Sequence, residues 1–229
     1  MRKFDQQSLQ ELKGKLGVDL MGVASVEKTT SRELKERTTA LLPGAKSVVV
    51  LGKEIYKEVV SLLRPSKGAG EAEPGELLKS HSDYLNGRLN RAVHELADFF
   101  KKEGYRSLPL PTVSPVDERF LTSLFSFKHA AQLAGLGTIG HHSLLITPQY
   151  GPRVRLACLL TEAALEASEL TNKDYCINCD ACIRECPARA IEAPKQGEVY
   201  SLNKFACRMY RLAGLTCSIC MKACDEVIA

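Results

Sequence analysis

Eight of the nine cysteines of this 229-residue chain lie in its last quarter, and their spacing constrains the fold more than any other feature. The first four follow the pattern Cys-x2-Cys-x2-Cys-x3-Cys-Pro, which ends at Pro187. The second four follow the pattern Cys-x9-Cys-x2-Cys-x3-Cys. The two groups are Cys176, Cys179, Cys182 and Cys186, and Cys207, Cys217, Cys220 and Cys224.

The first pattern is the cysteine run that holds 4Fe–4S clusters in bacterial ferredoxins. Three thiolates on a tight loop can reach three corners of one cluster, while the thiolate before Pro187 points to the other cluster. The spacing therefore predicts two 4Fe–4S clusters with crossed ligand sets. One set is Cys176, Cys179, Cys182 and Cys224, and the other is Cys186, Cys207, Cys217 and Cys220.

A pair of zinc sites is the main alternative, because zinc also binds Cys-x2-Cys pairs. Zinc does not need three cysteines at x2 spacing followed by Cys-Pro, so the iron–sulfur interpretation is favoured. A disulfide framework is typical of short secreted chains, and no apolar signal segment follows the first basic residues. The remaining cysteine, Cys158, stands in the apolar run Leu-Ala-Cys-Leu-Leu and is expected to be a small core residue.

Composition and charge narrow the class of protein further. Hydrophobic residues make up 45% of the chain and charged residues 25%, as in an ordinary globular protein. No apolar stretch approaches the length of a membrane span, so we expect a soluble, cytoplasmic protein without a membrane partner. The net charge of +4 is not concentrated in a run of lysine and arginine, which makes a nucleic-acid partner unlikely.

Hydrophobic periodicity divides the chain into two expected domains, an α/β (α+β) domain over residues 1–168 and a small ferredoxin-like domain over residues 169–229. A capping box at Ser8 predicts a short first helix, and the most regular pattern is an amphipathic helix over residues 76–103. A second helix is expected over residues 120–134 and a Gly/Pro-rich loop over residues 64–75. Strands are expected over residues 20–24, 47–51, 105–110, 144–147 and 153–160.

The sequence Gly135-Leu136-Gly137-Thr138-Ile139-Gly140 matches the G-x-G-x-x-G fingerprint of dinucleotide-binding proteins. That fingerprint requires a strand before it, a helix after it and an acidic residue about twenty positions later. Here a helical pattern precedes the glycines, a strand pattern follows them, and Arg155 occupies the acidic position. The glycines more plausibly allow the backbone to approach a flat ligand or another chain segment.

The stretch AGLGTIGHHSLLITPQYGPRVRL, residues 134–156, followed by the cysteines, resembles the epoxyqueuosine reductases, which are related to the reductive dehalogenases. The resemblance covers about residues 80–224. It includes Asp83-Tyr84 on a helix, then A-G-L-G-x-x-G, then P-x-Y-G, then the cysteines. It implies a nitroreductase-like domain that binds cobalamin and a ferredoxin-like module that reduces the cobalt.

The resemblance also implies a set of cofactor-binding residues. A corrinoid would lie against the backbone from Gly135 to Gly140. An imidazole can serve as an axial cobalt ligand or a proton donor, which makes the next two histidines candidates. A guanidinium can meet a corrinoid amide or a phosphate. The expected cofactor-binding residues are Gly135, Leu136, Gly137, Gly140, His142 and Arg153.

The chain departs from the family where a proton donor is expected. Epoxyqueuosine reductases carry an aspartate in a short D-[ST]-x-P segment, and the counterpart that the resemblance implies here is Thr112-Val113-Ser114-Pro115, which lacks the acid. The sequence shows no counterpart of the helical-repeat extension of many such reductases, so a tRNA substrate is less expected. The candidate catalytic residues are Tyr84, Asp117 and His141. For Tyr84 the alternative is packing on the long helix, and for His141 it is an exposed turn.

Three functions fit these features. Paired clusters pass single electrons and perform no organic chemistry themselves, so the other domain must hold the acceptor or dock a protein that does. The first hypothesis is an oxidoreductase that delivers electrons to cobalamin. The second is an electron carrier, or a reductase of a separate corrinoid protein. The third is a reductase with FMN in the first domain. Each needs an external electron donor of the ferredoxin or flavodoxin type.

Overall fold

The computed structural model describes residues 4–65, 74–112, 116–213 and 217–228. It divides into two compact units, each built from three separate segments. The first unit comprises Met1–Lys53, Leu85–Leu136 and Arg155–Asn172, and the second comprises Glu54–Tyr84, Gly137–Val154 and Lys173–Ala229. These units group the residues by contact, whereas the boundary at residue 168 divides them by sequence, so that boundary stays a prediction.

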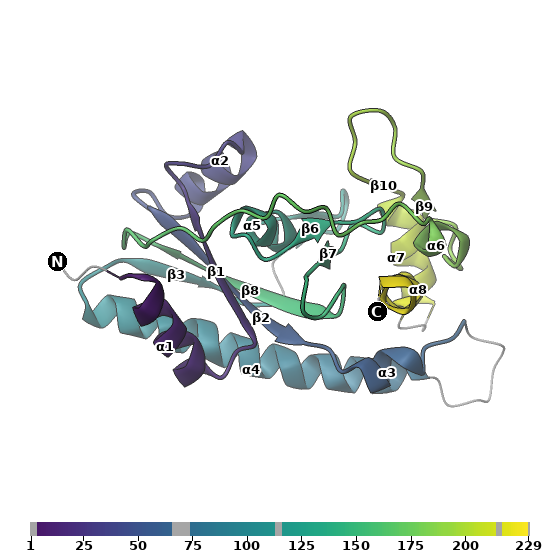
Figure 1. Cartoon of the computed structure of the whole chain (residues 1–229), viewed down its shortest axis with the longest axis horizontal. Coiled ribbons are helices and arrows are strands. Elements are labelled where there is room, and N and C mark those ends of the chain that lie inside the picture. The colour runs from purple at the N-terminus through teal and green to yellow at the C-terminus, as the bar shows by residue number, and fades with distance from the viewer. Residues whose placement is uncertain (1–3, 66–73, 113–115, 214–216, 229) are drawn as a thin grey trace. The chain divides into compact units, whose positions relative to one another are not determined.

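The elements alternate between helices and strands, which confirms the expected α/β (α+β) class (Figure 1). The helices are α1 (Gln6–Leu16), α2 (Arg32–Leu41), α3 (Lys57–Ser61), α4 (Pro74–Lys102), α5 (Phe127–Leu133), α6 (Ala181–Arg184), α7 (Lys204–Leu212) and α8 (Ile219–Ile228). The strands are β1 (Leu20–Ser25), β2 (Ser47–Glu54), β3 (Ser107–Leu110), β4 (Val116–Asp117), β5 (Thr122–Ser123), β6 (Thr138–Ile139), β7 (Leu145–Ile146), β8 (Val154–Thr161), β9 (Ile191–Glu192) and β10 (Ser201–Leu202).

A four-stranded sheet with the order β1-β2-β8-β3 organises the first unit. The outer pairs β1–β2 and β3–β8 are antiparallel. The central strands β2 and β8 carry long buried runs because side chains pack on both of their faces. Residues of α1 and α4 form the core cluster on one face, and α5 packs against β1 on the other (Figure 1).

Aromatic side chains fill one end of this core. Phe4 meets the rings of Phe99, Phe100 and Tyr105 edge to face, at centroid distances of 5.9, 5.3 and 6.3 Å. Edge-to-face contacts are a favoured geometry for aromatic pairs. Cys158 is fully buried in β8, which confirms its expected place in the core.

Two sequence-based expectations are wrong in this unit. The first helix is capped by Asp5 and not by Ser8, because the Asp5 side chain accepts the backbone N–H of Ser8 at 2.9 Å. The helix expected over residues 120–134 is reduced to α5, and β5 occupies part of the remainder. Thr122 and Ser126 carry short polar side chains that compete with helical hydrogen bonds, which favours a late helix start.

The second unit contains α3, the hairpin β6–β7, the small sheet β9–β10 and the helices α6, α7 and α8. The helix α6 packs against α8. The Lys222 ammonium on α8 donates to the Leu63 carbonyl at 2.8 Å, which fastens α8 to the end of α3. A loop is expected over residues 64–75, and residues 66–73 of it lie outside the described residues.

Gly135 is the glycine with the strictest conformational requirement. Its φ is 73°, in the left-handed region, and a Cβ at this position would collide with the backbone carbonyl of Glu169. We expect Gly135→Ala to destabilise the protein by at least about 2 kcal/mol, because left-handed strain alone costs roughly 1–2 kcal/mol. Gly87→Ala is the matched control, since nothing lies within 4 Å of the added methyl group. That helical site should gain up to about 1 kcal/mol. Thermal unfolding of both variants checks this, and equal melting temperatures would contradict it.

Candidate functional site

Cys176 and Cys179 lie on a curled loop, and Cys182 lies on the short helix α6 that follows it. Asn178 and Asp180 adopt the left-handed conformation, with φ of 54° and 56°, which asparagine and aspartate tolerate better than most residues. The Asp174 carboxylate accepts the N–H of Cys176 at 3.0 Å. The Arg184 guanidinium donates to the carbonyl of Cys179 at 2.8 Å. These contacts use backbone groups of Cys176 and Cys179, and neither thiol forms a disulfide.

Electrostatic interactions between the thiols divide the eight cysteines into two groups. Cys224 interacts with Cys182, Cys176 and Cys179, although about forty residues separate it from them in the sequence. The remaining thiols interact among themselves: Cys220 with Cys217, Cys207 and Cys186. A further interaction joins Cys220 to Cys182, so the two groups are neighbours. These interactions group the thiols in the same way as the predicted crossed sets, and the cysteines' role as cluster ligands stays a prediction.

Burial is the main cause of the raised thiol pKa values, and neighbouring thiols add to it. The pKa of Cys182 rises to about 11, and the pKa values of Cys220 and Cys224 rise to about 12. Such thiols stay protonated at neutral pH, and cluster binding has to displace their protons. Among the described residues, no three His, Cys, Asp or Glu side chains lie close enough to hold a single metal ion.

The raised thiol pKa values predict an alkaline-sensitive cluster-free protein. In the unfolded chain these thiols lose their protons near pH 8.5, whereas in the folded chain Cys182, Cys220 and Cys224 hold them up to about pH 11 to 12. The folded state then binds more protons, so the stabilisation is fully present below pH 8.5 and is lost as the pH rises toward 12. Thermal unfolding of cluster-free protein between pH 7 and pH 10.5 should show a falling melting temperature. A constant value over this range would contradict the burial of the thiols.

The glycine segment holds both ends of the cysteine loop. Thr138 on β6 donates its hydroxyl to Asp174 at 3.1 Å and accepts the N–H of Tyr175 at 2.9 Å. Three residues later, His141 forms a 3.0 Å hydrogen bond between Nδ1 and the Asp180 carboxylate. The hairpin that follows the glycines thus positions the cysteines through specific side-chain contacts.

The glycines themselves allow close approach between chain segments. Gly137 leaves no room for a Cβ against the backbone of Ile146 in β7, and Gly135 leaves none against Glu169. Of the two alternatives expected from the sequence, the structure accounts for these glycines by contact with another segment. Binding of a cofactor by Gly135, Leu136, Gly137 and Gly140 stays a prediction.

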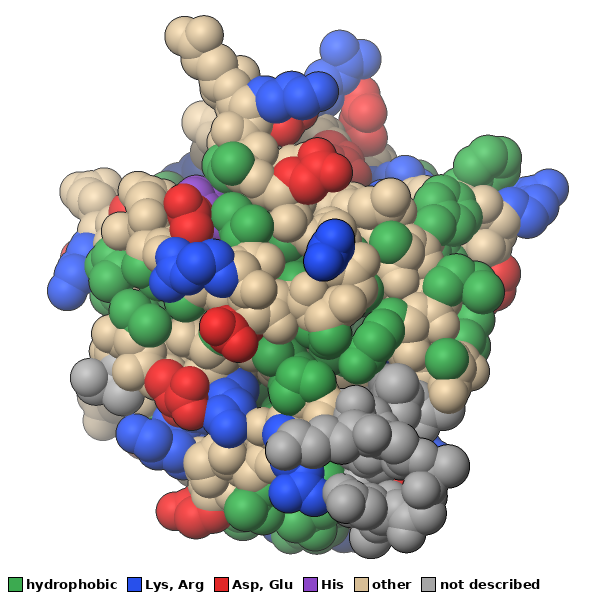
Figure 2. Space-filling model, turned by 90° about the vertical axis from the view of Figure 1, so that its right-hand side faces the viewer, with side chains coloured by type: hydrophobic (Ala, Val, Ile, Leu, Met, Phe, Trp, Pro, Cys, Tyr) green, Lys and Arg blue, Asp and Glu red, His purple; other side chains and the backbone are tan. Residues whose placement is uncertain are grey.

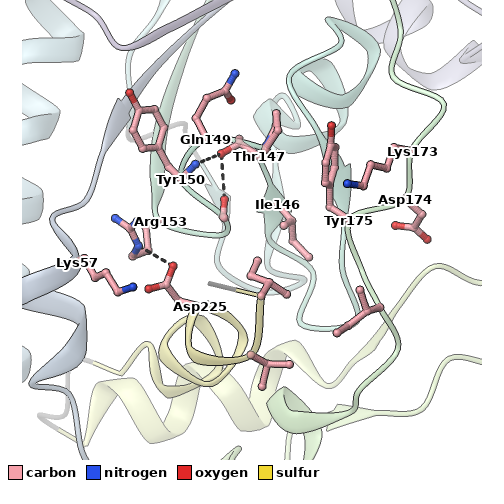
Figure 3. Close-up of a pocket in the computed structure, with 15 residues that line it drawn as sticks. Lys57, Ile146, Thr147, Gln149, Tyr150, Arg153, Lys173, Asp174, Tyr175 and Asp225 are labelled. Atoms are coloured by element: carbon pink, nitrogen blue, oxygen red, sulfur yellow. Dashed lines mark hydrogen bonds and ion pairs between the residues drawn. The ribbon is translucent and has the colours of Figure 1, made fainter.

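A pocket of about 750 Å³ lies beside the group that contains Cys176 and Cys224 (Figure 3). Tyr175 and Ile177, the two neighbours of Cys176, line it, and so does Asp225, which follows Cys224. The loop from Thr147 to Gly151 forms another wall. Further apolar lining comes from Ile146, Pro148, Val227 and Ile228.

Charged side chains of both signs line the same pocket: Lys57, Arg153, Lys173, Asp174 and Asp225. Its volume falls within the range of about 300–1,000 Å³ that is common for small-molecule sites. Apolar walls with a few charged groups are also typical of such sites.

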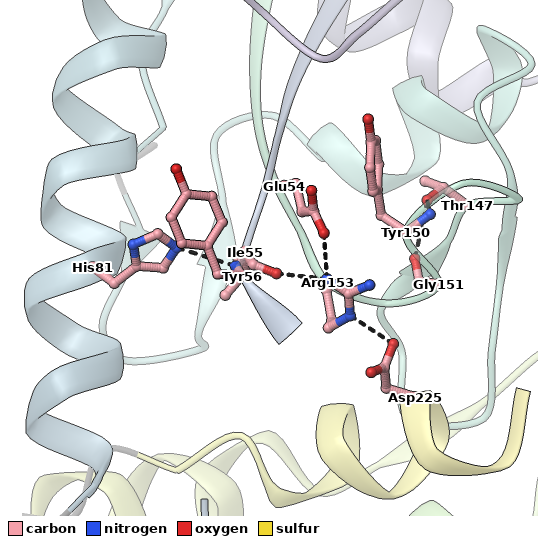
Figure 4. Close-up of polar contacts among 9 residues, drawn as sticks. All are labelled: Glu54, Ile55, Tyr56, His81, Thr147, Tyr150, Gly151, Arg153 and Asp225. Atoms are coloured by element: carbon pink, nitrogen blue, oxygen red, sulfur yellow. Dashed lines mark hydrogen bonds and ion pairs between the residues drawn. The ribbon is translucent and has the colours of Figure 1, made fainter. Parts of the chain in front are cut away.

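Arg153 is the centre of an ion-pair network at the base of this pocket (Figure 4). Its Nη1 donates to the Glu54 carboxylate at 2.7 Å and to the Ile55 carbonyl at 2.8 Å, and its Nε donates to the Asp225 carboxylate at 2.7 Å. The side chains of Arg153 and Asp225 are each only 9% exposed. Burial lowers the pKa of Arg153, but the hydrogen bonds and charges of Glu54 and Asp225 outweigh it and raise that pKa. Arg153 thereby ties α8 to the end of β2.

The expected cofactor-binding residues outside the glycines lie in this second unit. Arg153 lines the pocket, yet the hydrogen bonds that the structure records for it go to protein groups. His142 is buried, and its Nδ1 accepts the N–H of Leu144 at 3.0 Å. Roles for both residues in cofactor binding stay predictions.

The three candidate catalytic residues do not fall in one compact unit, because Asp117 belongs to the first and the other two to the second. Asp117 is partly exposed and pairs with Arg119 at 2.9 Å, and that hydrogen bond lowers its pKa. A carboxyl group with a lowered pKa is a poor proton donor near neutral pH. Tyr84 lies on α4 and is 55% exposed, and both its role as a proton donor and its packing on the long helix stay predictions. The counterpart of the family's aspartate segment includes residues 113–115, which lie outside the described residues.

Sequence reasoning missed Glu54, Asp180 and Asp225. The one available signal was at Asp225, where proline follows the fourth cysteine of the first run but aspartate follows Cys224. Nothing local marks Glu54 or Asp180, because their partners lie 99 and 39 residues away in the chain.

The comparisons agree with this geometry. The family described as "4Fe-4S binding domain" matches residues 170–192. Together with the mixed α/β fold, this match defines an iron–sulfur protein whose 4Fe–4S segment lies near the C-terminal end of the chain. More closely, the chain is a homologue of the epoxyqueuosine reductases and is related to the reductive dehalogenases.

Three relatives illustrate this. An epoxyqueuosine reductase of Prochlorococcus marinus (strain NATL2A) is 38% identical over 170 residues, which cover 74% of this chain and 48% of the relative. The structure of epoxyqueuosine reductase from Streptococcus thermophilus superposes with a TM-score of 0.58 at 16% identity, covering 96% of this chain and 65% of that one. A reductive dehalogenase structure described in connection with B12-dependent dehalogenation has a TM-score of 0.67 at 19% identity, covering 95% and 31%. These structures share the fold.

The chain spans about half the length of the curated relatives it matches, 44% and 48% for two epoxyqueuosine reductases. Within the described residues, every helix is too short or too polar to cross a membrane.

Proposed function

We propose that this chain is an iron–sulfur oxidoreductase that passes single electrons through two 4Fe–4S clusters to a cobalamin-type cofactor. The pocket beside Cys176 and Cys224 is the observation that carries the proposal. An acceptor in that pocket would lie next to one ligand set, which is the arrangement that short-range electron transfer needs. The relatives support a corrinoid as the acceptor, because one of them is described as acting in B12-dependent dehalogenation.

The pocket residues suit such a cofactor in part. Ile146, Pro148 and Ile177 provide apolar surface for one side of a flat macrocycle, and Lys57 and Lys173 can meet amide oxygens or a phosphate at its edge. A bound corrinoid supplies a cobalt centre that accepts single electrons and becomes a strong nucleophile. The protein's own contribution is to hold the cofactor beside the first cluster and to exclude water from its apolar side.

The two ligand sets have different roles in this proposal. The cluster next to the pocket is held by Cys176, Cys179, Cys182 and Cys224. The other four cysteines hold the cluster that receives electrons from the external donor. The grouping of the thiols and their raised pKa values support two sites that bind their clusters with release of protons.

A second candidate is an electron-transfer protein that reduces a separate corrinoid protein. The state of Asp117 favours it, because a carboxyl group whose pKa is lowered by its hydrogen bond to Arg119 is unsuited to proton donation. FMN in place of cobalamin is a further version of the enzyme. All three versions need the same clusters and differ in what the pocket binds.

Anaerobic absorption spectra of the cluster-loaded protein, with and without added cobalamin or FMN, separate these versions. Saturable binding with a base-off cobalamin spectrum supports the proposal. A protein that binds FMN and ignores cobalamin supports the flavin version, and a protein that binds neither supports the carrier.

Ile228→Trp places a bulky ring in the pocket without removing a side-chain hydrogen bond, because isoleucine makes none. This variant should weaken cobalamin binding at least about tenfold, which corresponds to about 1.4 kcal/mol. Val199→Trp is the matched control, since Val199 is 54% exposed and does not line the pocket. Equal affinities of the two variants would contradict binding in this pocket.

A further inference from the structure

Helix α7 exposes an apolar stripe. Phe205, Met209 and Leu212 are 54%, 65% and 61% exposed, although the helix is strongly amphipathic. Their spacing of four and three residues places them on one face of the helix. None of the nine α7 residues, all of them described, is buried. An exposed stripe of large apolar side chains is typical of a surface that binds another molecule.

A basic stripe runs beside the apolar one. Lys204, Arg208 and Arg211 have the same spacing, shifted by one residue, so they border the apolar side chains along the helix. The whole segment of residues 199–224 contains four basic residues and no acidic residue. Figure 2 shows exposed hydrophobic side chains beside lysine and arginine side chains on the face that includes this part of the second unit.

This helix also carries Cys207, which belongs to the group with Cys186, Cys217 and Cys220. The pocket adjoins the other group, through the neighbours of Cys176 and Cys224. If electrons pass to the pocket from the cluster beside it, they have to enter the protein at the other cluster. The cluster that first receives electrons is therefore the one that Cys207 helps to hold. Cys207 lies on α7, which has no buried residue.

We propose that the exposed face of α7 docks an acidic one-electron donor protein of the ferredoxin or flavodoxin type. This inference rests on the proposed electron path through the two clusters. The donor gives up one electron, and the oxidised 4Fe–4S cluster held by Cys186, Cys207, Cys217 and Cys220 gains it. No bond forms or breaks in this step, and no proton is required.

The chemistry of the surface matches such a donor. An apolar centre with a basic border is complementary to an acidic protein that exposes its redox centre. Small, transient interfaces of this kind are typical of electron-transfer partners. Opposite charges accelerate such encounters by about 10-fold to 1,000-fold at low salt, and added salt screens the effect.

Anaerobic stopped-flow mixing with a reduced plant-type or bacterial ferredoxin tests the proposal. The measured quantity is the second-order rate of cluster reduction at several salt concentrations. Lys204→Glu and Met209→Glu place acids on the two stripes without altering a cysteine or Arg211, whose charge acts on Cys207. Each should lower the rate at low salt at least about tenfold. Lys101→Glu and Lys102→Glu, exposed at the end of α4, are the matched controls.

Dithionite reduction separates this inference from the proposed function. Both α7 variants should be reduced by dithionite at the wild-type rate, with unchanged iron content, which shows that their clusters are intact. If ferredoxin reduces the α7 variants and the controls equally fast, the docking surface is wrong while the electron path stands. If dithionite reduces the clusters of the wild type but no electrons reach added cobalamin, the proposed function itself fails. A wild-type dimer that Met209→Glu dissociates without a change in rate would assign this face to a second copy and overturn the inference.

Discussion

The double variant Cys176→Ala/Cys224→Ala is expected to keep about four of the roughly eight iron atoms that two 4Fe–4S clusters contain. Both cysteines belong to the same interacting group in the structure, so the double variant removes ligands from one cluster and spares the other. If the clusters were built from sequence-local groups instead, the two cysteines would belong to different clusters and the variant would lose nearly all its iron.

Two further variants complete this test. Cys186→Ala/Cys224→Ala should lose both clusters, because these cysteines fall in different interacting groups. Cys158→Ala is the control, since Cys158 is a core residue of β8 and should leave the iron content unchanged. Iron and sulfide analysis of anaerobically prepared protein, with far-UV circular dichroism to verify folding, provides the measurement. A folded Cys176→Ala/Cys224→Ala protein without iron would refute the crossed ligand sets.

Arg153→Met should destabilise the cluster-loaded protein by about 3–5 kcal/mol, the usual cost of leaving a buried ionic partner unpaired. The variant removes the cation that Asp225 and Glu54 share, and Asp225 is only 9% exposed. For a chain of this size, such a loss lowers the melting temperature by roughly 10 °C. Arg32→Met is the matched control, because Arg32 and Glu36 are 90% and 62% exposed. That change should cost less than about 1 kcal/mol.

A second substitution shows whether the cost comes from the unpaired acid. Arg153→Met/Asp225→Leu removes both charges of the more buried pair, and replacement of both partners by apolar groups is often nearly neutral. The double variant should therefore melt above the single variant. A double variant that melts lower than Arg153→Met, or an Arg153→Met protein as stable as Arg32→Met, would show that the network does not fasten α8.

Features that depend on local spacing could be predicted from the sequence. The central strands follow from uninterrupted apolar runs such as Val48 to Leu51, and the long α4 helix follows from its apolar period. The division of the eight cysteines into two crossed groups also follows from spacing alone, because a tight loop cannot direct four thiolates to one cluster.

Features that depend on distant partners could not be predicted. The glycine motif indicates close approach but does not tell whether Ile146, Glu169 or a ligand approaches. The sequence predicts a cofactor contact for Arg153 because a guanidinium can meet a corrinoid amide or a phosphate, and its protein partners are not visible in the sequence. The two acids that pair with it come from β2 and α8, and only the fold brings them together. The start of α1 shows the same limit at short range, because Asp5 and Ser8 are both good caps and only the backbone decides between them.

The replacement of proline by Asp225 after the last cysteine now has a physical explanation. Proline ends the first cysteine run and redirects the chain, whereas α8 continues past Cys224 as a helix. An aspartate at this position both permits the helix and reaches Arg153. The second half of the cysteine pattern is therefore anchored by an ion pair instead of a turn.

Metal analysis of anaerobically purified protein, combined with electron paramagnetic resonance after reduction, is the most direct test that eight cysteines hold two electron-transferring clusters. We expect about eight irons and eight sulfides per chain, and a reduced spectrum with the splitting of two interacting 4Fe–4S clusters. Zinc in place of iron, or fewer than about four irons per chain, would contradict the electron path through this protein.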